Sequence, residues 1–229
     1  MNKQYNLDEI LKKLKSKAKP ENLIGMAKFA IGGDKRLGVA VPDMRRLAKE
    51  IGKDQKLSLE LWKTGIPEAM IVASMIGVPL EVTEKQADAW VKDIAFWDLC
   101  DQTAMNLFEK LPFVSKKIVE WSKSDIEFTK RMSYALIACL AWHDKNASDE
   151  FFIKLFPIIK SGATDERNFV KKAVNWALRN IGKRNINLNK EAINLAKEIQ
   201  KIDSKAAKWV ASDTIRELDS KTIQNRLQK

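Results

Sequence analysis

The stretch DERNFVKKAVNWALRNI, residues 165–181, has two sides of different chemistry at helical spacing. On one side, apolar residues recur three and four positions apart, which is the period of an amphipathic α-helix. These residues are Val170, Ala173, Val174, Ala177 and Ile181. Similar spacing occurs near the start of the chain, and no segment sustains the alternation of a β-hairpin. The early residues are Leu7, Ile10, Leu11 and Leu14. The pattern predicts an all-α fold.

Residues that start and end helices recur along the chain. Pro42 suits a first helical turn that closes at Gly52, and Pro67 suits another that closes at Gly77. The run Thr83-Glu84-Lys85-Gln86 has the form of a capping box. Further helix starts are expected near Asp98, Pro112, Ser124, Asp149, Asp165, Asn189 and Ser204.

The number and spacing of these short helices indicate a repeat architecture. Helix pairs at intervals of about 35 to 40 residues are typical of HEAT-type repeats. We therefore expect a HEAT-like helical repeat solenoid that forms a single domain over residues 1–229. In such an array the second helices of the pairs line a concave face, where we expect the functional site to lie.

The charge balance points to a polyanionic partner. Lys and Arg number 41 against 30 Asp and Glu, so the formal net charge is +11. A charge of this size favours nucleic acid as the first candidate. Runs such as Lys12-Lys13-Leu14-Lys15 are also typical of a solvated helix face, and the charge alone leaves both interpretations open.

Cysteine usage and hydropathy predict a cytoplasmic protein with no membrane partner. Cys100 and Cys139 lie inside apolar patterns, and nothing resembles a disulfide framework or a CxxC metal pair. The N-terminus carries acids and lysines where a signal peptide would have an apolar core. No apolar run approaches the ~20 residues that cross a bilayer.

The second side of the stretch 165–181 is basic and aromatic. Four residues share an arc of about 60°, with Phe169 at its edge. The four are Lys172, Trp176, Arg179 and Lys183. A tryptophan among cations suits an aromatic wall for a sugar or a base. The alternative is an indole that lies under a neighbouring helix and contacts Lys172 and Arg179 by cation–π interaction.

Arg131 occupies a similar position on an earlier helix. Ala135 and Ala138 share its side and would leave room for a ligand. An arginine in such a groove can donate two parallel hydrogen bonds to a phosphate. The alternative is a helix-surface ion pair with Glu127 at spacing four.

Trp97 and Asp101 lie four residues apart and are expected on one face of a helix capped by Asp98. A carboxylate beside an indole can stabilise a sugar that becomes cationic in a transition state, or orient a water. The alternative for Asp101 is an acid that the helix dipole favours in a first turn.

Because His143 is the only histidine and there is no glycine-rich phosphate loop, we expect neither a metal nor a cofactor.

Four segments carry a resemblance to the DNA alkylation repair glycosylases of the AlkD type, which are built from HEAT-like repeats. They are Val41-Pro42-Asp43-Met44-Arg45-Arg46, Trp97-Asp98-Leu99-Cys100-Asp101, Lys130-Arg131-Met132-Ser133-Tyr134 and Phe169-Val170-Lys171-Lys172-Ala173-Val174-Asn175-Trp176-Ala177-Leu178-Arg179. The second and fourth segments together are specific, and the resemblance runs over nearly the whole chain. It implies a monofunctional glycosylase that excises N3- and N7-alkylated purines from duplex DNA.

The resemblance also implies roles for individual residues. Asp101 corresponds to the catalytic carboxylate, and Trp97 and Trp176 to the pair that flanks the deoxyribose. Arg131 and Arg179 correspond to the phosphate-binding arginines. The other residues that we assign to DNA binding are Phe169, Lys172, Lys183, Arg45, Arg46 and Phe29.

The sequence departs from the family's pattern at two positions, and two other functions are alternatives to a glycosylase. Phe29 stands where the characterised branch tends to have tyrosine, and Ala40 where it tends to have a polar side chain. One alternative is a non-catalytic HEAT-like module that binds damaged, bent or branched DNA. The other is a protein-binding scaffold. We expect a monomer with no obligate protein partner.

Overall fold

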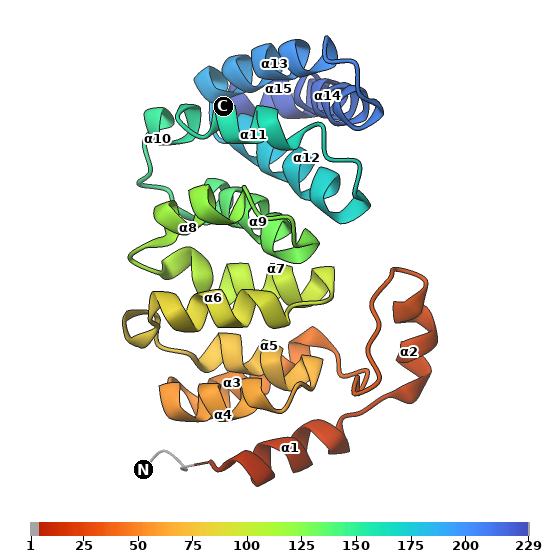
Figure 1. Cartoon of the computed structure of the whole chain (residues 1–229), viewed down its shortest axis with the longest axis vertical. Helices are drawn as coiled ribbons and strands as arrows, with labels where there is room; N and C mark the ends of the chain where they lie inside the picture. Colours follow the sequence, from red (N-terminus) through yellow and green to blue (C-terminus); the bar gives the residue numbers. More distant parts are fainter. Residues whose placement is uncertain (1–4, 229) are drawn as a thin grey trace. The chain divides into compact units, whose positions relative to one another are not determined.

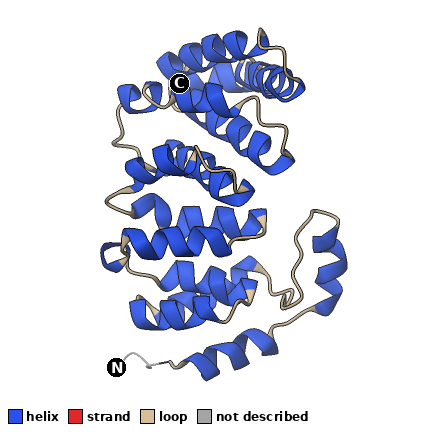
Figure 2. Cartoon of the chain, viewed as in Figure 1, coloured by secondary structure: helices blue, strands red, loops and turns tan. Residues whose placement is uncertain are grey.

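The computed structural model describes residues 5–228, and within them it consists of helices and loops without a strand (Figure 2). In chain order (Figure 1), the elements are α1 (Leu7–Ser16), α2 (Pro20–Ala27), α3 (Val41–Ile51), α4 (Gln55–Lys63), α5 (Pro67–Ile76), η1 (Pro79–Glu81), α6 (Glu84–Asp93), α7 (Trp97–Asn106), η2 (Phe108–Lys110), α8 (Val114–Trp121), α9 (Glu127–His143), α10 (Asp149–Ile153), α11 (Phe156–Gly162), α12 (Asn168–Gly182), α13 (Ile186–Gln200), α14 (Lys205–Leu218) and α15 (Lys221–Leu227). The all-α prediction is confirmed.

The helices fall into two compact units, Met1–Pro112 and Phe113–Lys229. The expectation of one domain over residues 1–229 stays a prediction. Between residues 5 and 228, no helix has the length and apolar character needed to cross a bilayer.

Several predicted helix boundaries are confirmed. Gly52 and Gly77 are the C-cap residues of α3 and α5. The Thr83 side chain accepts a hydrogen bond from the Gln86 backbone N–H, which caps α6. The Gln86 side chain accepts from Gln55 instead of closing the capping box.

The helix start expected near Asp98 is confirmed, because α7 begins at Trp97, but Asp98 does not cap it. Asp98, Asp165 and Asn189 all bind other partners instead of capping the start of a helix. Asp98 lies inside α7 and pairs with Arg36. Asp165 precedes α12, where Arg167 and Lys130 hydrogen-bond its carboxylate; the Arg167 bond is the main reason that its pKa falls to about 2. Asn189 lies within α13, and its side chain donates to the carbonyls of two other helix ends.

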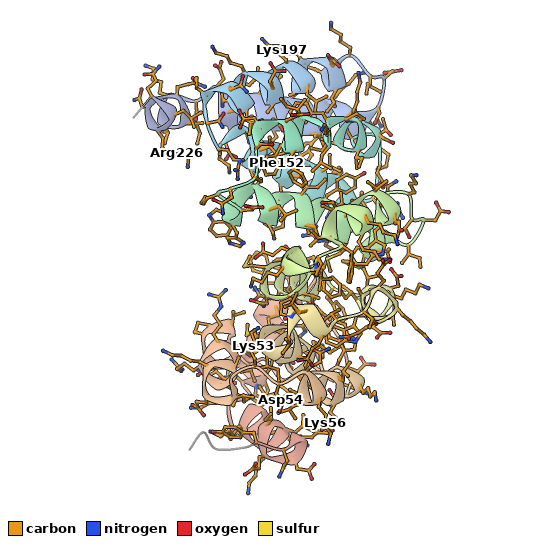
Figure 3. The ribbon with its side chains drawn as sticks, turned by 90° about the vertical axis from the view of Figure 1, so that its left-hand side faces the viewer. Lys53, Asp54, Lys56, Phe152, Lys197 and Arg226 are labelled. Carbon is orange, nitrogen blue, oxygen red and sulfur yellow. The ribbon has the colours of Figure 1, made fainter. Side chains whose placement is uncertain are left out.

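The first unit is built around α5. Figure 1 shows α3, α4 and α5 side by side, and α5 is buried along nearly its whole length. Lys53 and Asp54 connect α3 to α4 (Figure 3). Asp54 caps α4 by accepting from the Leu57 N–H, and Lys53 donates to two carbonyls at the end of α5. Since these bonds satisfy helix termini, they fix how α4 and α5 pack.

In the second unit, α9 packs directly against α12. The apolar side predicted for α12 is confirmed, because all five of its residues are fully buried. Ala135 and Ala138 of α9 are also fully buried. The expected room for a ligand beside these two alanines is therefore wrong: small side chains here allow close approach of two helices.

Candidate nucleic-acid interface

Trp97 and Asp101 lie on α7 of the first unit, one helical turn apart and each half-buried. Their predicted common face is confirmed by the helix that contains both. Because α7 begins at Trp97, Asp101 lies beyond the first turn, and Asp98 is the acid in that turn. The helix dipole therefore acts less on Asp101 than the sequence suggested.

The Trp97 indole is tied to the loop that follows α2. Its Nε1 donates to the Phe29 carbonyl oxygen at 2.8 Å. The Phe29 side chain is 71% exposed, and the next residue, Ala30, adopts a left-handed backbone with φ of 56°. The sequence assigned Phe29 and Trp97 to one interface, and the structure brings them into direct contact.

Two acids anchor the continuation of this loop. The Arg36 guanidinium is buried and donates to both Asp98 carboxylate oxygens, at 2.7 and 3.1 Å. Glu68, fully buried on α5, accepts from the backbone N–H groups of Leu37 and Gly38. These contacts fix the loop against α5 and α7. Neither contact was predicted from the sequence, although a lone acid in the apolar run of α5 signals a buried partner.

The basic residues of α3 are presented to solvent. Arg45 is exposed, and Arg46 is exposed while pairing with Asp43 on the same helix. Ala40 is the N-cap of α3 and provides no side-chain cap. A polar side chain at this position would therefore be able to cap the helix.

The predicted basic stripe of α12 is present but partly neutralised. Lys172 is exposed, whereas Arg179 and Lys183 both pair with Glu217 of α14. The Lys183 Nζ lies 2.8 Å from a Glu217 oxygen, and Arg179 also lies 3.5 Å from Asp213. These acids were not predicted as partners from the sequence, because they lie more than thirty residues away in the chain. A phosphate would have to compete with them for the two cations.

Trp176, on the same helix, is half-buried and lines a cavity within the second unit. Among residues 5–228, no cation stacks over its ring; the cation–π pairs include Lys171 with Trp209 and Arg184 with Phe152. The alternative of an indole that covers Lys172 and Arg179 is therefore wrong.

Arg131 is more buried than a surface phosphate ligand. It is 5% exposed, and its Nη1 donates to the Phe169 carbonyl oxygen at 2.7 Å. The Phe169 ring contacts Phe128 at a centroid distance of 5.3 Å. In this arrangement Arg131 holds the start of α12 against α9. Its role in phosphate binding stays a prediction.

Comparison with known proteins gives three findings. A model of the family described as DNA alkylation repair enzyme matches residues 10–217. No match was found among curated proteins. The chain is similar to a solved structure described as a new family of proteins related to the HEAT-like repeat DNA glycosylases with affinity for branched DNA structures; the TM-score is 0.76. The two chains are 20% identical, and the match covers 93% of this chain and 95% of that one. The predicted HEAT-like fold is confirmed.

Proposed function

Because this chain belongs to the family of DNA alkylation repair enzymes, we propose that it is a monofunctional DNA glycosylase for N3- and N7-alkylated purines in duplex DNA. The observation that carries the proposal is the pair of Trp97 and Asp101 on α7, with the indole fixed to the Phe29 carbonyl. A carboxylate and an indole are thus held one turn apart on a rigid element, as a reacting group requires.

The proposed reaction is hydrolysis of the glycosidic bond. Alkylation at N3 or N7 gives the purine a positive charge. When the C1′–N9 bond breaks, the electron pair moves to the base, which leaves neutral, and positive charge develops on the deoxyribose. The Asp101 carboxylate stabilises that charge and orients the water that adds to C1′ and loses a proton. The product is an abasic site.

The second unit contributes cations for the DNA backbone. Lys172, Arg179 and Lys183 lie on the exposed side of α12, and Trp176 is the proposed second indole. Because phosphate contacts of this kind carry no sequence information, binding would be independent of sequence. In the first unit, the proposed ligands of the DNA backbone are Arg45 and Arg46 of α3.

Direct base release tests this proposal. The full chain is incubated with duplex DNA that contains N7-methylguanine or N3-methyladenine, and the released base is quantified by chromatography. We expect release well above the spontaneous depurination of the same duplex without protein. Duplex binding without release of either base would contradict the proposal.

Such a result would favour a second candidate, a module that binds damaged, bent or branched DNA without cleaving it. The observation behind this candidate is the similar structure, whose proteins are described as having affinity for branched DNA. The module would use the basic surface and not Asp101.

Opposite effects on duplex binding are expected for Glu217→Gln and Arg179→Ala. Burial raises the pKa of Glu217, but the hydrogen bond from Lys183 and the charge of Arg179 outweigh it, so the pKa is lowered. The carboxylate is therefore charged at neutral pH and competes with phosphate. We expect Arg179→Ala to weaken duplex binding and to make the fall of log affinity with log salt shallower by about one unit. We expect Glu217→Gln to strengthen binding and to make that fall steeper by about one unit. Fluorescence anisotropy over a salt series measures both.

Glu198→Gln is the matched control for this prediction. Glu198 is an exposed acid of α13 that pairs with a single lysine, Lys160, at 2.7 Å. Removing its charge changes the net charge equally without freeing a proposed DNA ligand. Equal gains in affinity for Glu198→Gln and Glu217→Gln would mean that only net charge matters.

A further inference from the structure

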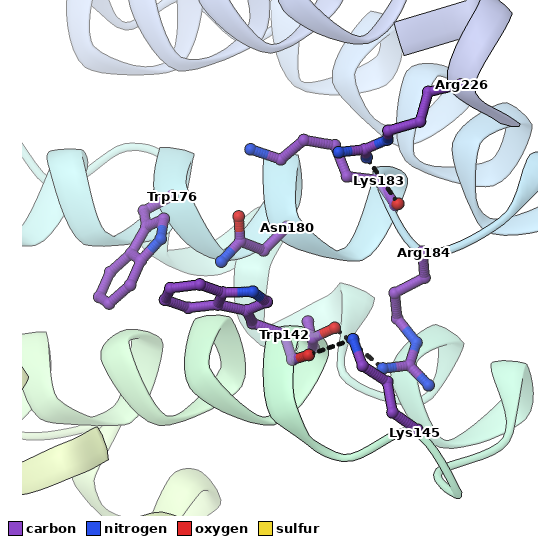
Figure 4. A pocket seen from close by; sticks show the side chains of 8 residues that line it. Trp142, Lys145, Trp176, Asn180, Lys183, Arg184 and Arg226 are labelled. Carbon is purple, nitrogen blue, oxygen red and sulfur yellow. Dashed lines mark hydrogen bonds between the residues drawn. The ribbon is translucent and has the colours of Figure 1, made fainter. Parts of the chain in front are cut away.

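A cavity of about 510 Å³ lies within the second unit, between the C-terminal end of α9, the middle and end of α12, and α15 (Figure 4). Its volume is within the range of about 300 to 1,000 Å³ that is typical of small-molecule sites. Its lining consists of Ala141, Trp142, Lys145, Trp176, Asn180, Lys183, Arg184 and Arg226.

Apart from Ala141, the apolar residues of this lining are two tryptophans. Trp142 is 55% exposed at the end of α9, and Trp176 is half-buried on α12. Figure 4 shows the two rings as neighbours on one side of the cavity. Since exposure of so much indole surface to water is unfavourable, a planar ring that stacked here would remove that surface from solvent.

The charged residues of the lining are all cations, and three of them donate hydrogen bonds to backbone carbonyls. Arg184 donates to the carbonyls of Ala141, Asp144 and Ala147, Arg226 donates to that of Lys183 at 2.9 Å, and Lys145 donates to that of Trp142. Carbonyls fix a cation without cancelling its full charge. Arg184 caps the end of α9 in this way, whereas Lys145 and Arg226 are exposed.

Aromatic faces combined with fixed cations match the chemistry of a nucleotide whose base is unpaired. A base inside a duplex offers no free face for stacking, whereas an unpaired base has two. We propose that this cavity binds one unpaired DNA nucleotide, with its base against Trp142 and Trp176 and its phosphate facing Lys145 and Arg226. The inference rests on the proposed function in taking DNA as the partner, and it shares Trp176 with the proposed glycosylase site. It assigns to the second unit a site for single-stranded DNA beside a duplex.

The test compares two DNA substrates bound by the full chain. One is a blunt duplex; the other is the same duplex with a single-stranded overhang that contains 2-aminopurine, whose fluorescence falls when it stacks. We expect quenching on binding and tighter binding of the overhang substrate. Trp142→Ala should reduce the overhang preference about tenfold, because one stacked base is lost, and Trp142→Phe should restore part of it.

Trp209→Ala is the matched control. Trp209 is a 40% exposed tryptophan of α14 in the same unit, lies under Lys171, and is outside the cavity. This variant should keep the wild-type overhang preference. The inference would be overturned if the wild type bound both substrates with equal affinity or if binding caused no quenching. It would also be overturned if Trp142→Ala kept the wild-type preference for the overhang. The same holds if a phosphorylated peptide displaces the overhang substrate at concentrations as low as those at which a free oligonucleotide does.

Base release measured on the same preparation separates this inference from the proposed function. Release of N7-methylguanine from the blunt duplex without an overhang preference overturns only the nucleotide site. An overhang preference without base release overturns only the glycosylase assignment.

Discussion

Asp101→Asn is expected to reduce the rate of base release from N7-methylguanine duplex by about a hundredfold to a thousandfold, while duplex affinity stays close to that of the wild type. The amide has nearly the same shape as the carboxylate but lacks its charge, and that charge is needed only when the sugar becomes cationic. Single-turnover release measures the chemical step, and anisotropy measures binding.

Asp203→Asn is the control for this variant. Asp203 is a fully exposed acid of the second unit that pairs with Lys208, so the substitution changes the net charge equally without altering α7. We expect wild-type release from it. If Asp101→Asn also releases base at the wild-type rate, Asp101 has no part in the mechanism.

Selectivity for the charge of the leaving base is the other large effect that we expect. N7-methylguanine and N3-methyladenine leave as neutral bases, whereas uracil must leave as an anion or be protonated by a general acid. A positioned general acid contributes about 10² to 10⁴ in rate. Since the proposed site has a carboxylate and no assigned acid, we expect no measurable release of uracil.

The same duplex sequence with each lesion in turn makes this comparison. His143→Ala serves as a control, because the only histidine stacks on Trp142 at the end of α9 and is not assigned to the reaction. It should leave the selectivity unchanged. Efficient excision of uracil by the wild type would contradict a mechanism without a general acid.

Much of the helical framework was predictable because its signals are local. Pro42 and Pro67 near helix starts, and Gly52 and Gly77 at helix ends, act through backbone geometry within one or two turns. Asp98 and Asp165 are typical cap residues that do not cap a helix here, because Asp98 pairs with Arg36, and Asp165 with Lys130 and Arg167. Competition for a carboxylate is settled by tertiary neighbours, which a local pattern does not contain.

For the candidate site, the sequence by itself determined that Trp97 and Asp101 share a helix face, because a spacing of four residues is one turn. It also determined which side of α12 is buried. Only the tertiary structure decided which cations stay available to a ligand. Arg131 is buried against Phe169, Arg179 and Lys183 are paired with Glu217, and Trp142 is left exposed beside a cavity. These partners lie 34 to 38 residues apart in the chain, so their contacts depend on how whole helices pack and not on the period of any one helix.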